Sequence, residues 1–398
     1  MELSKLQTLQ SRISSPFITC EFGGEQFGLR QAFSAPTRTR DVSYVTSLTT
    51  DKKASGAVNS YSLSMTYLVS PGMDPNYIDM VISKAKDRKI YFTYGDTAQP
   101  EYYYIKEQAI ITNIVPNIDF SKYSLTYTIS ATSSVALGYT VKRSYPEHKS
   151  EKPSKIIEDL LYSTDSPFLS IFPGMRDKSK VLNRLLIPHN DEPVYIAEEK
   201  DISPLDYLRV LVSKMTCSDG SFYALLMHDE PDNIDGPYFE IVNSILHQGK
   251  GNHYSVDIDV GYPSDTPIYS FMPSQNASLA LITSFQEEVD KPQPAKATDE
   301  GLQFSPTVSI ASENGKTSPE ILQWWKTITA YPINATLRTR GLLKPAVLCD
   351  YLHINIYFFG IKYNYSGYYM ITGQKDTIDS SGYSTELSLV RVQGEERF

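Results

Sequence analysis

The sequence predicts a β-rich α+β fold, and three observations lead to that prediction. The chain holds 29 Tyr against 16 Phe and 2 Trp, and tyrosine favours strands and protein interfaces. Stretches in which apolar and polar residues alternate recur along the whole chain, which is typical of half-buried strands. Helical periodicity is confined to short segments. A chain of 398 residues is expected to form two to four domains.

Residues 1–145 are expected to form a first β module that contains one helix. Between Val58 and Val69, tyrosine, leucine and methionine alternate with serine and threonine, which predicts a strand with one buried face. A helix is expected after Pro75, with Asp74 as its cap. Further strands are predicted at 89–94, 101–115 and 123–130, and a polar turn at Pro116-Asn117 is expected to join the last two.

Residues 146–216 are expected to form a small α/β domain. A short helix is predicted at Ile156–Tyr162, with Ser154 as its cap. A second helix is predicted over 203–211, because Ser203 stands at the cap position and a proline and an aspartate occupy the first turn.

Residues 217–286 and 328–398 are expected to form a second, discontinuous β module. Its predicted strands are Ser221–Met227, Tyr254–Val260, Leu348–Phe358, Gly367–Ile371 and Thr385–Val392, the last two joined by a Ser-Ser-Gly turn at 380–382. Within Leu348–Phe358 the residues Leu348, Leu352, Ile354, Ile356 and Phe358 are expected to share one face. Residues 287–327 are expected to be an insertion or linker, since 290–318 is rich in turn-forming and charged residues.

Charge and cysteine content exclude several classes of function. The net charge is −9, which is unsuited to gripping nucleic acid but does not hinder DNA that slides past an acidic surface. Cys20, Cys217 and Cys349 are odd in number and far apart, so buried cysteines are expected rather than disulfides or a zinc site. The polar start of the chain and the lack of a long apolar run predict a soluble protein made in the cytoplasm.

Candidate metal and catalytic groups are weak. His247, His253, Asp257 and Asp259 could ligate a divalent metal, but the aspartates share a strand face that the histidines reach only through a glycine turn, so a solvated strand edge is favoured. His228-Asp229-Glu230 favours a turn, and Asp191 is expected to be solvated. The sequence lacks G-x-S-x-G, H-E-x-x-H, C-x-x-C and phosphate-loop motifs. No cofactor, no metal and no enzymatic activity are therefore predicted.

Four aromatic residues are the interface candidates. Trp324 and Trp325 could stack on a sugar or a base, but core packing or an interface anchor is favoured. Tyr351 and Tyr357 lie on the second face of the strand predicted at Leu348–Phe358.

The C-terminal motifs resemble a known family. The run Arg340–Val347 is followed by Ser-Gly-Tyr-Tyr-Met-Ile-Thr-Gly at 366–373 and Tyr-Ser-Thr-Glu-Leu-Ser-Leu at 383–389. This order resembles the second barrel of the central baseplate hub proteins of contractile phage tails, which are related to the hub domains of type VI secretion spikes. Ala346 departs from the glycine that is frequent there. Residues 153–161 and 201–211 resemble the small domain between that family's two barrels, and the N-terminal module is similar to a tail-tube fold.

The resemblance implies two tail-tube-like β-barrel domains with a small α/β domain between them and an inserted loop region. It implies a homotrimeric, pseudo-six-fold ring that joins a hexameric tail tube to a trimeric spike and leaves a central channel for DNA. Tape-measure and baseplate wedge proteins are further implied partners. The implied location is the virion tail baseplate, assembled in the host cytoplasm.

Two alternatives remain open at this point. One is a carbohydrate-binding or host-receptor-contacting tail protein that uses Trp324, Trp325 and surface tyrosines. The other is a hub that carries a cell-wall-degrading activity, which we expect to need a catalytic extension beyond Phe398.

Overall fold

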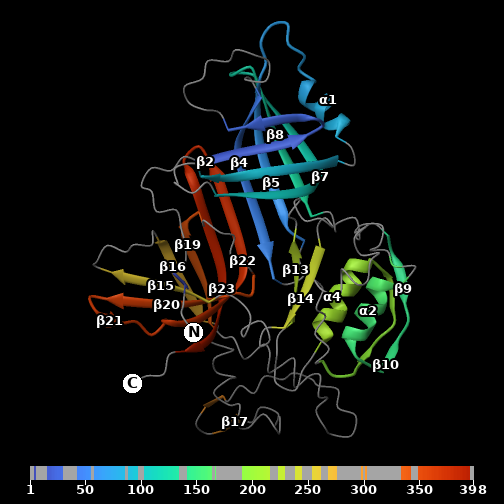
Figure 1. Cartoon of the computed structure of the whole chain (residues 1–398), viewed down its shortest axis with the longest axis vertical. Coiled ribbons are helices and arrows are strands. Elements are labelled where there is room, and N and C mark those ends of the chain that lie inside the picture. Colours follow the sequence, from blue (N-terminus) through green and yellow to red (C-terminus); the bar gives the residue numbers. More distant parts are fainter. Residues whose placement is uncertain are drawn as a thin grey trace.

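In the computed structural model of the chain, strands dominate and helices are few (Figure 1). The structure describes residues 4–5, 16–29, 43–54, 58–85, 88–96, 103–133, 141–163, 166, 191–215, 223–228, 238–243, 253–260, 268–275, 297–298, 301–302, 333–341 and 348–394. Within these residues, fifteen strands form a single hydrogen-bonded sheet, and four further strand pairs stand apart from it. No helix in the described part of the chain is long and apolar enough to cross a membrane.

The N-terminal half of the sheet is an antiparallel array with one helix. In spatial order its strands are β4 (Ser43–Lys53), β5 (Ser60–Leu68), β8 (Ser124–Thr132), β7 (Tyr103–Asp119), β6 (Lys89–Asp96), β2 (Pro16–Phe22) and β3 (Glu25–Gly28). The alternation predicted for Val58–Val69 is confirmed, because Tyr61, Leu63, Met65 and Tyr67 of β5 are all buried. Helix α1 (Tyr77–Lys84) covers this core with Ile78 and Val81.

Strand pairing curls the N-terminal half back on itself. An isolated parallel bridge links Leu29, just after β3, to Val45 in β4. Two closed barrels were expected, but within the described residues no ladder of paired strands closes either half into a barrel. The general prediction of a β-rich fold is confirmed.

The turn predicted at Pro116-Asn117 is wrong. Strand β7 runs on through both residues and turns only after Asp119. The described part of β6 pairs with β7 only as far as Ile110, so the later residues of β7 have one side that is not paired with β6. Pro116 is tolerated on such an edge because no backbone amide is needed there for a strand hydrogen bond. The Asp119 side chain accepts hydrogen bonds from the backbone amides of Ser121 (3.0 Å) and Lys122 (3.2 Å) and so fixes the turn.

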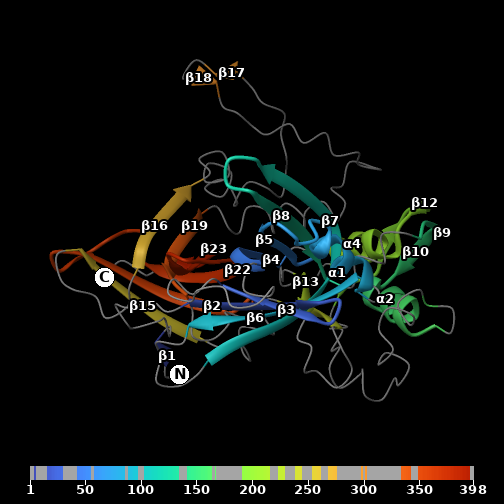
Figure 2. The same cartoon turned by 90° about the horizontal axis from the view of Figure 1, so that it is seen from above.

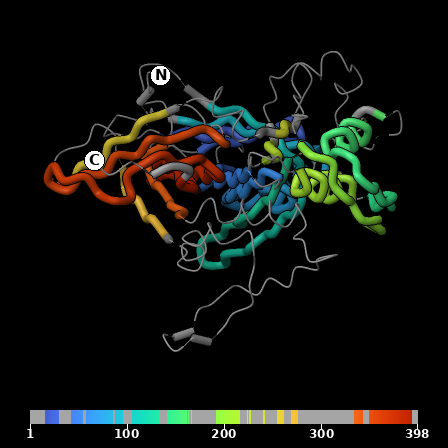
Figure 3. The backbone as a smooth tube through the Cα atoms, turned by 90° about the horizontal axis from the view of Figure 1, so that it is seen from below, coloured from blue at the N-terminus to red at the C-terminus, as the bar shows by residue number. Residues whose placement is uncertain are grey.

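A small helical unit lies at one end of the molecule (green in Figure 3). It consists of α2 (Pro153–Tyr162), α4 (Pro204–Lys214), β9 (Arg143–Tyr145), β10 (His148–Glu151), β11 (Val194–Ile196) and β12 (Glu199–Ile202). The two helices share one core with Val194 and Ile196 of β11. A neighbouring hairpin of β13 (Tyr223–His228) and β14 (Tyr238–Asn243) adds side chains to that core.

Of the three predicted helix caps, one is confirmed and two differ from the prediction. Ser203 accepts a hydrogen bond from the Asp206 amide (3.1 Å) and caps α4 as predicted. Helix α2 begins earlier than predicted, and its Ser154 amide donates to the Asp191 carboxylate (2.8 Å). Asp191 is therefore buried and acts as the cap, so the prediction that it is solvated is wrong. Helix α1 follows Asn76 rather than Asp74, which accepts from the Asn76 amide.

The C-terminal half holds the remaining strands. They are β15 (His253–Val260), β16 (Ile268–Gln275), β19 (Ile333–Arg340), β20 (Tyr351–Phe358), β21 (Ile361–Lys362), β22 (Gly367–Asp379) and β23 (Gly382–Gly394), with β1 (Ser4–Lys5) parallel to β15. The turn predicted at 380–382 is confirmed. Two short strands, β17 (Ala297–Thr298) and β18 (Gly301–Leu302), fall in the predicted insertion.

The strand predicted at Leu348–Phe358 begins only at Tyr351. Leu348 and Cys349 lie in a turn, where the Cys349 amide donates to the Ile371 carbonyl (2.7 Å). Leu352, Ile354 and Ile356 face the core as expected, but Phe358 is exposed at the strand end, where the chain turns toward β21.

Strand β22 joins the two halves. Its first residues, up to Met370, pair with β20, and from Gly373 onward it pairs with β4, with a bulge before Gly373. Figure 2 shows β22 running alongside β4, and β23 pairs with β22. Ile378 of β22 and Tyr383 of β23 are consequently part of the core of the N-terminal half.

Candidate functional site

The four predicted interface residues have different surroundings. Tyr351 is 3% exposed and packs in the core of the C-terminal half, so its side chain is a core residue of this chain. Tyr357 is half-buried, and the Lys362 ammonium lies 5.8 Å from its ring centroid. Trp324 and Trp325 lie outside the described residues.

The described residues bring no metal-ligating group of three or more together. Asp257 accepts a hydrogen bond from the Asn355 side-chain amide (2.9 Å), while His247 lies outside the described part. His228 is the last residue of β13 and not part of the expected turn, and Asp229 and Glu230 lie outside the described residues. Cys20 and Cys349 are buried, as predicted, and burial raises the pKa of the Cys349 thiol to about 12, which suits an inert thiol. Cys217 is not described.

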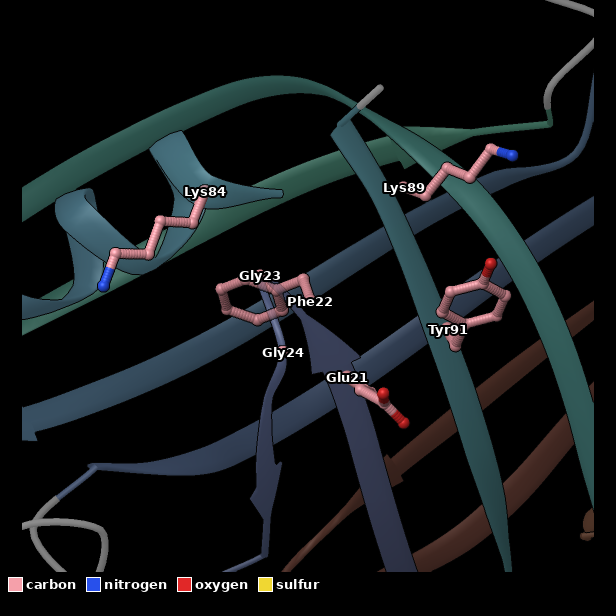
Figure 4. Close-up of a pocket in the computed structure, with 7 residues that line it drawn as sticks. All are labelled: Glu21, Phe22, Gly23, Gly24, Lys84, Lys89 and Tyr91. Atoms are coloured by element: carbon pink, nitrogen blue, oxygen red, sulfur yellow. The ribbon is translucent and has the colours of Figure 1, made fainter. Parts of the chain in front are cut away.

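A pocket of 330 Å³ lies beside the β2–β3 turn, lined by Glu21, Phe22, Gly23, Gly24, Lys84, Lys89 and Tyr91. Its charged groups do not converge. In Figure 4 the ammonium groups of Lys84 and Lys89 point in opposite directions, and the Glu21 carboxylate points away from both. A small-molecule site needs a few polar groups aimed at one point, and this arrangement lacks them.

A buried polar cluster lies where β22 meets β4. Asp376 is fully buried and accepts hydrogen bonds from Thr385 (2.6 Å), Gln374 (2.8 Å) and Thr50 (3.5 Å). Sequence reasoning missed this cluster. The sequence does contain an indication of it, because the two-residue period of a strand places Gln374 and Asp376 on the same face as the buried Ile378.

The Lys52–Glu107 ion pair belongs to the same cluster. The Lys52 ammonium contacts the Glu107 carboxylate, and Tyr94 donates a hydrogen bond to the second Glu107 oxygen (3.1 Å). Burial raises the pKa of Tyr94 well above its usual value, and the Glu107 charge adds to the effect. A neutral tyrosine that donates to a carboxylate helps to hold that charge in the core.

The opposite face of the joined sheet is polar and rich in hydroxyl groups. Five hydroxyl residues on neighbouring strands lie opposite one another in the strand register and so form a row across both halves. Each of their side chains is exposed or half-buried: Ser130, Ser62, Thr49, Thr377 and Ser384. We call this the hydroxyl row. Side chains opposite one another on paired strands lie on the same face, so the row forms one surface that spans the joint between the halves.

A second row beside it alternates in charge. Its members, in spatial order, are Asp51, Lys375, Glu386 and Arg338. Arg338 and Glu386 form an ion pair of 3.7 Å. Because the four formal charges cancel, this charge row adds no net field to the face.

Two turns expose large apolar side chains. The β7–β8 turn presents Ile118, Phe120 and Tyr123, with Phe120 83% exposed. The β20–β21 turn presents Phe359 and Ile361, at the left in Figure 1. Contiguous exposed apolar patches can mark protein-binding surfaces, so the two turns are candidate contact surfaces. The sequence patterns did not mark these residues as contact surfaces. Tyr123 was instead expected to begin the strand at 123–130, but β8 begins at Ser124 and Tyr123 is exposed in the turn before it.

No family model and no curated protein matches the sequence. Solved structures do match. A 43 kDa tail protein of prophage MuSo2 from Shewanella oneidensis has a TM-score of 0.52 and 11% identity, covering 95% of this chain and 99% of the other. A tail protein from Neisseria meningitidis MC58 has a TM-score of 0.50 and 10% identity, covering 95% and 97%.

A third match is the E. coli c3393 protein, at a TM-score of 0.45 and 9% identity over 89% of this chain and 76% of the other. It is described as a component of the type VI secretion system that is structurally similar to the T4 bacteriophage tail proteins gp27 and gp5. The two solved structures with a TM-score of 0.50 or above are both tail proteins, in agreement with the resemblance in the sequence. The fold is that of these two tail proteins, along nearly the whole chain.

Proposed function

We propose that this chain is the structural hub of a contractile-tail baseplate. Three copies form a pseudo-six-fold ring that joins the hexameric tail tube to the trimeric spike, and the ring encloses a channel through which DNA passes. The protein acts in the virion tail through its surfaces and catalyses no reaction. Tape-measure and baseplate wedge proteins are further contacts of the assembled hub.

The observation that carries this proposal is the polar face shared by the two halves. The hydroxyl row and the charge row run without interruption across β4 and β22. A hydrated wall of balanced charge neither attracts phosphates, as a basic groove would, nor offers apolar side chains for bases to stack on. Such a wall suits passage of DNA without binding, and we place this face toward the channel.

The layout of the chain also supports the proposal. Each half is a β array, so three chains supply six such units, which is the number needed to match a hexameric tube. The fold shared with two phage tail proteins agrees with this role. The exposed apolar turns supply contact surfaces for neighbouring subunits.

The deciding experiment is native mass spectrometry of the full chain, followed by cryo-electron microscopy of the chain mixed with its tube and spike proteins. We expect a trimer and a ring density that connects the tube to the spike. A stable monomer at micromolar concentration that binds neither protein would contradict the proposal. A glycan-array screen separates the carbohydrate-binding alternative, since a hub is expected to bind no glycan.

A further inference from the structure

The joint between the two halves contains an unequal number of buried charges. The groups that face it are Lys52 and Thr50 from β4, Tyr94 from β6, Glu107 from β7, Gln374 and Asp376 from β22, and Tyr383 and Thr385 from β23. Among these, two carboxyl groups share one ammonium. If both carboxyl groups were ionised, the cluster would bury a net negative charge, which is strongly unfavourable in a core.

The contacts show which carboxyl group takes the cation. Lys52 touches Glu107, and Tyr94 donates to the same carboxylate. The partners of Asp376 are instead two hydroxyl groups and an amide, which are neutral. The Thr50 hydroxyl, 3.5 Å away, can also accept the proton that a neutral acid donates. Glu107 is therefore the carboxyl group that is paired with the cation, and Asp376 is the group that relieves the excess charge by keeping a proton.

We propose that Asp376 is a neutral carboxylic acid in the folded chain, and that loss of its proton loosens the β4–β22 joint. The contact between β4 and β22, and with it the contact between the two halves, then depends on the protonation of Asp376. This inference stands independently of the hub function, because it rests only on contacts within one chain.

Electrostatics agree with the geometry. Burial raises the pKa of Asp376 above its ordinary value of 3.8, the Thr385 and Gln374 hydrogen bonds and the Lys52 charge oppose the rise, and Glu107 adds to it. Burial also raises the pKa of Tyr383 well above its usual range, so the tyrosine stays neutral beside Asp376.

The sign of the pH effect follows from linkage. The closed joint holds a proton that the open joint releases above pH 3.8. As the pH rises from that value to the raised pKa of the closed state, the population of open joints grows about tenfold per pH unit, and above that pKa it levels off.

The test is a titration of the full chain with ¹³C-labelled aspartate. We expect one carboxyl resonance, absent from Asp376→Asn, to keep the chemical shift of a protonated acid at pH values where the exposed aspartates are ionised. Thr385→Val removes a hydrogen bond that favours the ionised form, so it should move this midpoint to higher pH. An Asp376 resonance at the carboxylate position throughout would overturn the proposal.

Hydrogen exchange of the β4 and β22 amides supplies the second readout, after correction for the intrinsic rate. Protection in the wild type should fall with rising pH, whereas Asp376→Asn should lack this slope. Glu386→Gln, on the solvent face of β23, is the matched control and should behave as the wild type does. Equal slopes in all three proteins would also overturn the proposal. If Asp376→Asn does not fold, the titrations of the wild type and of Thr385→Val still show whether the Asp376 carboxyl group is protonated.

Discussion

Tyr94 of β6 and Tyr383 of β23 meet edge to face in the core of the N-terminal half, with their ring centroids 6.2 Å apart. The contact joins the first quarter of the chain to its end. Both rings are buried, and the Gly341 amide donates to the Tyr383 carbonyl (2.8 Å). Folding of the N-terminal half therefore depends on residues that are distant in sequence.

Replacing Tyr383 with alanine tests that dependence. Removal of a large buried ring leaves a cavity, and we expect Tyr383→Ala to lower the free energy of unfolding by about 3–5 kcal/mol. Chemical denaturation of the full chain measures the loss. Tyr269→Ala, at a position 58% exposed, is the control and should change stability by about 0.5 kcal/mol or less. Equal effects at both positions would refute the structural role of Tyr383.

The Gly23-Gly24 turn provides a matched pair of substitutions. Both glycines adopt positive φ, at +58° and +81°, so alanine strains the backbone at each. A Cβ on Gly23 would overlap the Val81 carbonyl oxygen, whereas a Cβ on Gly24 meets no atom within 4 Å. We expect Gly23→Ala to cost about 1–3 kcal/mol more than Gly24→Ala, because α1 must move. Comparable denaturation midpoints for the two variants would contradict this.

The local features of the fold were predictable from the sequence. The inward residues of β5 and the Ser203 cap each depend on neighbours within a few residues, and both predictions are confirmed. Burial of Asp191 was missed because its partner, the Ser154 amide, lies far away in the sequence. The turn at Pro116-Asn117 was misplaced because the pattern does not reveal that β7 continues as an edge.

The joint was beyond the reach of sequence patterns for a physical reason. Alternation determines which side of a strand faces the core, but it does not determine which strand lies alongside. The pairing of Thr50 with Asp376 links segments that local patterns treat as separate modules. The hydroxyl row has the same origin, because each strand alone shows only alternate serines and threonines.

Helix α4 offers a test of local capping. Ser203 accepts from the Asp206 amide, and its hydroxyl also donates to the Asp206 carboxylate (2.7 Å). We expect Ser203→Ala to destabilise the chain by about 1 kcal/mol. Ser213→Ala, which removes an exposed hydroxyl near the end of the same helix, should be nearly neutral. Thermal unfolding compares the two variants, and a larger loss at Ser213 would rule out the capping role.

The β7–β8 turn tests assembly, and this prediction rests on the proposed hub function. Phe120 and Tyr123 are about four-fifths exposed, so the single chain gains little stability from them. We expect the double substitution Phe120→Ser, Tyr123→Ser to leave the unfolding free energy unchanged within about 0.5 kcal/mol. Binding to a neighbouring subunit or partner should weaken by about tenfold or more, because aromatic anchors dominate interfaces.

Sedimentation and binding measurements on the full chain read out that loss. Lys122→Ala in the same turn is the control, since it removes only an exposed ion pair with Asp119, which contributes little. If the double variant assembles as the wild type does, the β7–β8 turn is not an interface. Equivalent substitutions at Phe359 and Ile361 then decide whether the β20–β21 turn supplies the contact instead. Because the two turns lie in different halves of the sheet, loss of assembly in only one variant identifies the half that meets the partner.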